Sequence, residues 1–94
     1  MSKNQEEFLN NLVSILAKIS NEDEMLEFLH DLLTEKEMEN LAIRLNCAHL
    51  LYSGKTYSEV IKETKISSTT LSRISRCLQQ GKGYNSVLKG KKKE

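Results

Sequence analysis

Small hydroxyl side chains and arginines gather in one stretch toward the C-terminal end of the sequence. They are Ser67, Ser68, Thr69, Thr70, Ser72, Arg73 and Arg76. A short hydroxyl both donates and accepts hydrogen bonds, which suits it to base edges in a DNA groove. A guanidinium group pairs with phosphate oxygens. The stretch therefore predicts a DNA-reading surface, with Thr56 on the preceding helix as a further candidate contact. The alternative is a set of ordinary helix caps, because Ser and Thr are common there.

Two short helices would position these side chains. Residues 56–59, Thr-Tyr-Ser-Glu, form a capping box that opens the first helix, which ends near residues 64–65. Ser67 caps the second helix, and Gly stops it at position 81. The inward-facing residues of the second helix are Leu71, Ile74 and Leu78. The pattern predicts a helix-turn-helix over residues 56–80 that inserts helix 67–78 into the major groove.

Apolar spacing predicts three more helices before this motif. The first covers about residues 5–19, and Ser20 or Asn21 caps the second. A capping box at residues 34–37 opens the third, which stops at Gly54. Apolar residues lie on two sides of the third helix, so it needs its own core and a second partner, either another helix or another subunit.

These elements, with one or two turns over residues 84–88, predict an all-α fold of five to six helices. A chain of 94 residues forms one domain at most. We therefore expect a single domain over residues 1–94, with residues 90–94 as a flexible basic tail. The core of such a chain is thin, and part of its apolar surface could be buried against a second copy.

The formal net charge of +1 hides an uneven distribution. Residues 1–66 contain 7 Lys/Arg and 12 Asp/Glu, which gives −5, and residues 67–94 contain 7 Lys/Arg and 1 Glu, which gives +6. A basic C-terminal quarter is typical of a phosphate-binding surface. The lysines at 91–93 could instead form a solvated tail, but Arg73 and Arg76 lie within a periodic helix.

Several classes of protein lack support in the sequence. No apolar run approaches the length of a membrane span, and the polar, acidic N-terminus is unlike a signal peptide, so we expect a cytoplasmic protein associated with the nucleoid. Cys47 and Cys77 stand without a metal-binding pattern and are expected as reduced thiols rather than a disulfide. His30 and His49 lie on separate helices, so no metal site is predicted. No catalytic motif is present, which predicts a protein that is not an enzyme.

The segment 60–74 resembles the helix-turn-helix motifs of bacterial repressors, most specifically in Ile66-Ser67-x-x-Thr70-Leu71-Ser72-Arg73. It differs from that pattern at two positions. Ile61 stands where such motifs usually have alanine, which should hold the two helices slightly further apart. Lys65 stands where they usually have glycine, so it must accept modest strain or a differently shaped turn.

The residues around the motif narrow the resemblance. They are Leu32-Leu33-Thr34-x-x-Glu37-x-x-x-Leu41-x-x-Arg44 and Leu51-x-x-Gly54. With the motif, they resemble the Trp repressor family over about residues 8–89, and the branch known as YerC/YecD most of all. The resemblance implies a homodimer with interlocked N-terminal helices. Two reading heads roughly 34 Å apart would then bind a pseudo-palindromic DNA operator as a transcriptional repressor.

The resemblance also implies a possible small corepressor, L-tryptophan in the founding member. Arg44 would stack on its indole, Arg73 would hold its carboxylate, and Thr34 would line the pocket. Cys77 occupies the position of a serine that helps to hold the amino group, and Ile74 replaces a glycine next to Arg73. Ile74 places a branched side chain where the backbone must come close. A different ligand, no ligand at all, or an ordinary salt bridge at Arg44 are the alternatives.

A second function remains open from the sequence. The acidic first 66 residues and the obstructed ligand site would also suit a protein-interaction module that kept a helix-turn-helix scaffold.

Overall fold

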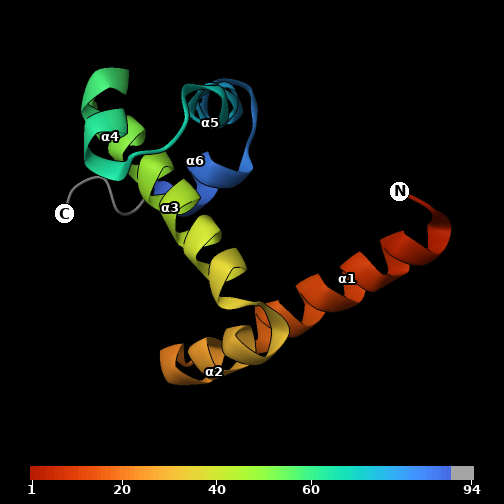
Figure 1. The fold of residues 1–94 in the computed structure, drawn as a ribbon. Coiled ribbons are helices and arrows are strands. Elements are labelled where there is room, and N and C mark those ends of the chain that lie inside the picture. Colours follow the sequence, from red (N-terminus) through yellow and green to blue (C-terminus); the bar gives the residue numbers. More distant parts are fainter. Residues whose placement is uncertain (90–94) are drawn as a thin grey trace. The chain divides into compact units, whose positions relative to one another are not determined.

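The computed structural model describes residues 1–89, and that range is built of α-helices joined by short connections (Figure 1). The helices are α1 (Lys3–Lys18), α2 (Glu22–Leu32), α3 (Glu35–Tyr52), α4 (Tyr57–Thr64), α5 (Ser68–Gln80) and α6 (Gly83–Leu88). The predicted all-α class with five to six helices is confirmed. None of the helices within the described range is long and apolar enough to span a bilayer.

The chain divides into two compact units, one of residues 1–38 and one that begins at Glu39. The expectation of a single domain stays a prediction, and the flexible tail expected at residues 90–94 lies outside the described residues.

Local hydrogen bonds set where the helices begin. Asn21, rather than Ser20, caps α2, because its side-chain oxygen accepts from the Glu24 N–H at 2.9 Å. The predicted capping box that opens α3 is present: the Thr34 N–H donates to Glu37 Oε1 at 2.8 Å, and the Glu37 N–H donates to Thr34 Oγ1 at 3.1 Å. The first helix begins earlier than predicted, at Lys3, because Ser2 forms a further capping box.

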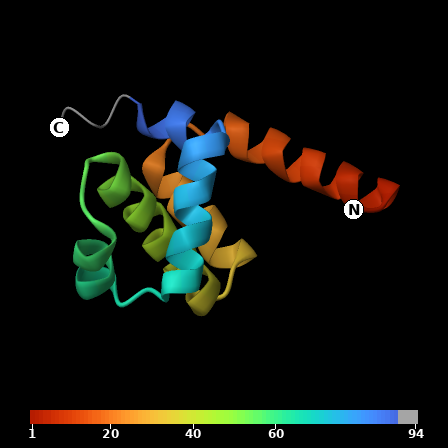
Figure 2. The ribbon, with the colours of Figure 1, turned by 90° about the horizontal axis from the view of Figure 1, so that it is seen from above.

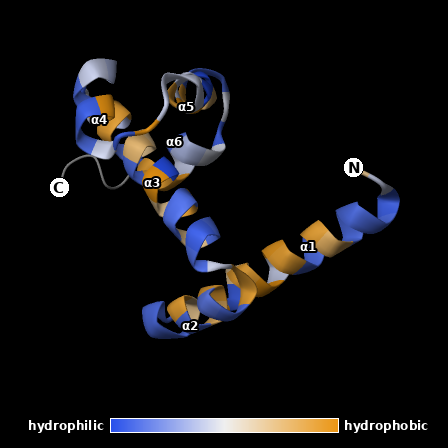
Figure 3. Cartoon of the chain, in the orientation of Figure 1, coloured by the Kyte–Doolittle hydropathy of each residue, from blue (hydrophilic) through white to orange (hydrophobic). Residues whose placement is uncertain are grey.

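The helices of the first unit bury little. Neither α1 nor α2, both within the described range, contains a buried residue. Apolar residues nevertheless recur along both helices, as the hydropathy colouring shows (Figure 3). The large exposed apolar side chains of these two helices are Phe8, Leu9, Val13, Ile15, Leu26 and Leu32. The first unit therefore presents apolar surface that the single chain leaves open to water.

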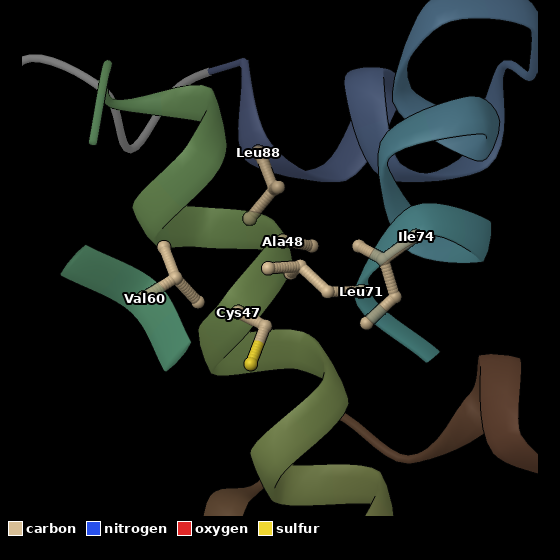
Figure 4. Close-up of a cluster of buried hydrophobic side chains, with 6 residues drawn as sticks. All are labelled: Cys47, Ala48, Val60, Leu71, Ile74 and Leu88. Carbon is tan, nitrogen blue, oxygen red and sulfur yellow. The ribbon is translucent and has the colours of Figure 1, made fainter. Parts of the chain in front are cut away.

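The core lies in the second unit, around α3 (Figure 4). Its buried residues are Cys47, Ala48, Val60, Leu71, Ile74 and Leu88. They come from α3, α4, α5 and α6, so α3 supplies the central element against which the other three helices pack. The predicted inward positions Leu71 and Ile74 are confirmed, and Leu78 is half-buried beside them. The core thus fixes α4 and α5 to the body.

Two glycine-containing turns end α3 and α5. At the end of α3, Gly54 has a φ of 104°, which glycine adopts cheaply. The Gly54 N–H donates to Leu51 O and the Lys55 N–H to Leu50 O, each at 3.0 Å, which is the paired pattern of a Schellman motif. At the end of α5, a Cβ on Gly81 would come within 2.8 Å of the Cys77 carbonyl oxygen. Both predicted stops are therefore confirmed.

Candidate DNA interface

The helix-turn-helix consists of α4, a three-residue turn and α5 (Figure 2). A capping box starts α4: the Thr56 N–H donates to Glu59 Oε1 at 2.8 Å, and the Glu59 N–H donates to Thr56 Oγ1 at 3.2 Å. The hydrogen bond from the Thr56 backbone N–H, the Thr56 side chain and nearby Lys55 hold the pKa of the Glu59 carboxyl below its ordinary value. The Thr56 hydroxyl therefore already serves the helix start, and its contact with DNA stays a prediction.

The first turn of α5 divides the hydroxyl cluster into two groups. Ser67 Oγ accepts from the Thr70 N–H at 3.2 Å and donates to Thr70 Oγ1 at 2.9 Å. These two hydroxyls are thus engaged with each other as a helix cap. Ser68, Thr69 and Ser72 are exposed. Ser67 is exposed as well, but its hydroxyl is engaged in the cap, in which Ser68, Thr69 and Ser72 take no part.

Both predicted arginines of α5 are exposed. Arg73 and Arg76 line one shallow pocket of about 290 Å³ together with Cys77 and Gln80. Leu71 and Ile74, by contrast, are 0% and 2% exposed. The helix therefore has one side fixed in the core and polar side chains available along the rest of its length.

A threonine that the sequence analysis missed holds the turn in place. Thr64 Oγ1 donates to the Val60 carbonyl at 2.7 Å, and the same oxygen accepts from the Ile66 N–H at 3.3 Å. The Cys47 thiol on α3 also donates to it, at 3.4 Å. One hydroxyl thus joins α3, α4 and the approach to α5. The contact with Cys47 spans 17 residues, so no local pattern announces it.

Lys65 follows Thr64 in a left-handed conformation, with φ 62° and ψ 18°. The sequence left open whether this residue accepts strain, and the structure answers that it does. A side chain with a Cβ costs about 1–2 kcal/mol in this region, and glycine avoids that cost. The two helices are therefore joined through an unfavourable backbone geometry.

Three of the four candidate ligand residues belong to the second unit, where they line two different pockets. Thr34 belongs to the first unit, and its hydroxyl is engaged at the start of α3. Arg44 lines a pocket of about 280 Å³ with Lys65 and Thr70. Arg73 and Cys77 line the pocket on α5 described above. Both cysteines are free thiols, as expected, with Cys47 buried and Cys77 half-buried.

Comparison with known proteins identifies the relatives of this chain. The family model described as Trp repressor protein matches residues 7–92. The chain belongs to the Trp repressor family. A protein from Bacillus subtilis (strain 168) named YerC, whose function is uncharacterised, is 37% identical over 73 residues, which cover 78% of this chain and 70% of the relative. The crystal structure of a candidate Trp repressor from Staphylococcus aureus has a TM-score of 0.84 at 28% identity and covers 100% of this chain and 98% of its own.

The predicted resemblance to the Trp repressor family, including its YerC branch, is therefore confirmed. Membership of this family of DNA-binding regulators indicates a regulatory protein. In this Trp repressor family member, Ile74 stands where the resemblance implies glycine, and it is part of the core. Its branched side chain is buried in that core, whereas Arg73 is exposed.

Proposed function

We propose that this protein is a sequence-specific transcriptional regulator, acting as a repressor, that inserts α5 into the major groove of an operator. The proposal rests on the contrast between buried and exposed side chains of α5. Leu71 and Ile74 anchor it in the core, while Ser68, Thr69 and Ser72 remain exposed. Exposed hydroxyls near the start of a reading helix suit base edges, and arginines further along suit phosphates. Because the partner is duplex DNA, the proposed place of action is the nucleoid in the cytoplasm.

Selection of binding sites from a random duplex library tests this proposal. The native protein should enrich one pseudo-palindromic sequence. Ser68→Ala and Thr69→Ala should each change the preferred base at one position per half-site, since a base contact contributes about 1–3 kcal/mol of discrimination. Ser86→Ala on α6, which removes an exposed hydroxyl outside the reading helix, should leave the selected sequence unchanged.

The same selection distinguishes the alternatives. Because Ile74 stands where the family resemblance implies glycine, we expect the same enriched sequence with and without L-tryptophan. Enrichment that requires L-tryptophan would instead support the pocket of Thr34, Arg44, Arg73 and Cys77. A library without any enriched sequence, together with a stoichiometric protein partner, would contradict DNA reading and favour a protein-interaction module.

We further propose that the regulator is a homodimer formed through its N-terminal helices. The exposed apolar side chains of α1 and α2 support this, because Phe8 is 66% and Val13 56% exposed in the single chain. Large contiguous apolar surfaces on soluble proteins mark interaction sites. A twofold dimer would also supply the two reading heads that a pseudo-palindromic operator requires.

Sedimentation velocity should give the mass of two chains for the native protein. Val13→Asp should shift the protein toward monomer, because a carboxylate in an apolar interface is costly to desolvate. Ser14→Asp is the matched control, since it adds the same charge to the neighbouring exposed position on the polar side of α1. A native monomer, or equal behaviour of the two variants, would rule out an interface through this stripe.

A further inference from the structure

Lys65 has the least favourable backbone conformation in the described part of the chain. It is the one non-glycine residue with positive φ between residues 1 and 89. Strained residues of this kind persist where the surroundings impose them, and they concentrate at functional sites. A glycine would relieve the strain but would remove the side chain. The strain at Lys65 therefore indicates a function for the lysine side chain.

Lys65 lines a pocket of about 280 Å³ with Arg44. The polar neighbours in the pocket are Asn40, Thr64 and Thr70. Two cationic side chains, one from the turn and one from α3, thus share one pocket. No Asp or Glu is among the described residues that line it. Like charges at one site repel each other, so this arrangement is stabilised when an anion binds between them.

The pocket lies at the end of α5 that would approach the bases. Thr70 belongs to the first turn of α5, and Lys65 lies between α4 and α5 in the turn that leads into it. In a helix-turn-helix the first helix crosses the DNA backbone while the N-terminal residues of the second helix contact base edges, and the turn that holds Lys65 joins these two parts. The anion nearest to this pocket in such a complex is a phosphodiester.

We propose that Lys65 and Arg44 together bind one phosphate of the DNA backbone beside the groove that α5 reads. This inference rests on the proposed function. It assigns the strained lysine a role that the family resemblance does not give it, since that pattern has glycine at this position. The contact fixes the position of α5 on the duplex and carries no sequence information of its own.

Lys65→Gly tests the proposal, because it should stabilise the fold while it weakens DNA binding. Removing the strain should raise the Tm by about 4–8 °C. Removing the charge should weaken binding to the selected duplex by about tenfold, with equal loss for unrelated duplexes, and should make the salt dependence shallower by about 0.9 in a log–log plot. Lys65→Arg should retain the duplex affinity and the slope of the salt dependence. Lys65→Gln should show the weaker affinity and the shallower slope without the gain in Tm. Lys18→Gln, which removes the same charge from α1, is the control and should change neither.

Three outcomes would overturn the proposal. Unchanged duplex affinity and slope in Lys65→Gly would show that Lys65 does not contact DNA, although native binding would still support the proposed function. Additive losses in Lys65→Gly and Arg44→Gln would exclude a shared phosphate, since partners at one site are non-additive. Inorganic phosphate that binds the free protein and is lost in Lys65→Gly, with duplex affinity unchanged, would assign the pocket to a soluble anion. Failure of the native protein to bind duplex DNA would instead overturn the proposed function.

Discussion

Leu71→Ala should lower the free energy of unfolding by about 2–5 kcal/mol, which is the usual range for a buried leucine. Leu71 is fully buried and belongs to a core cluster with Cys47, Ala48 and Val60. That cluster joins α5 to α3 and α4 (Figure 4). The loss is large against the 5–15 kcal/mol that typically separates folded from unfolded protein. Urea unfolding followed by circular dichroism measures it through the midpoint at constant m-value.

The same substitution should also impair DNA binding at temperatures where the protein remains folded, because α5 loses its anchor. Leu71→Met is the control, since it keeps the volume and should cost less than about 1.5 kcal/mol. If Leu71→Ala keeps both the native midpoint and the native duplex affinity, then α5 is not held to the body through this side chain.

The second large effect concerns the arginines of α5. The double variant Arg73→Ala/Arg76→Ala should lose affinity for all duplexes alike. Each lost phosphate contact removes about 0.9 from the slope of log K against log salt, so the slope should become shallower by about 1.8. Fluorescence anisotropy with the selected duplex and a scrambled duplex, between about 50 and 200 mM salt, measures both quantities.

Its control replaces both arginines by lysine, which keeps the charges but not the planar fork of donors. The lysine variant should keep most of the salt slope. A double alanine variant that changes the preferred sequence while it keeps the native slope would mean that these arginines read bases. Arg73 would then belong with Ser68 and Thr69 rather than with the backbone contacts.

Local patterns in the sequence predicted the features that depend on neighbouring residues. The capping boxes at Thr34 and Thr56 and the cap at Ser67 involve residues three positions apart, so the spacing alone identifies them. The buried positions Leu71 and Ile74 follow from helical periodicity. The same reasoning reached the family through motifs that lie close together along the chain.

Features that depend on distant residues were not predicted. The Thr64 hydroxyl is fixed by Cys47 on another helix, and the pocket of Lys65 combines the turn with α3. Asn85 was missed for the same reason: its side-chain amide donates to the Leu78 and Gly81 carbonyls, at 2.7 and 3.2 Å, and ties α6 to the end of α5. Spacing along the sequence carries no information about such contacts until the helices are packed.

The unburied helices α1 and α2 have a consequence for how such a regulator would respond to its own abundance. When apolar surface is covered only by a second copy, the stability of the folded protein depends on the concentration of chains. At low levels the number of dimers rises with the square of the number of chains, so operator occupancy would increase more steeply than synthesis. In the proposed dimer, the exposed apolar side chains of α1 and α2 would thereby make regulation respond steeply to the level of the protein.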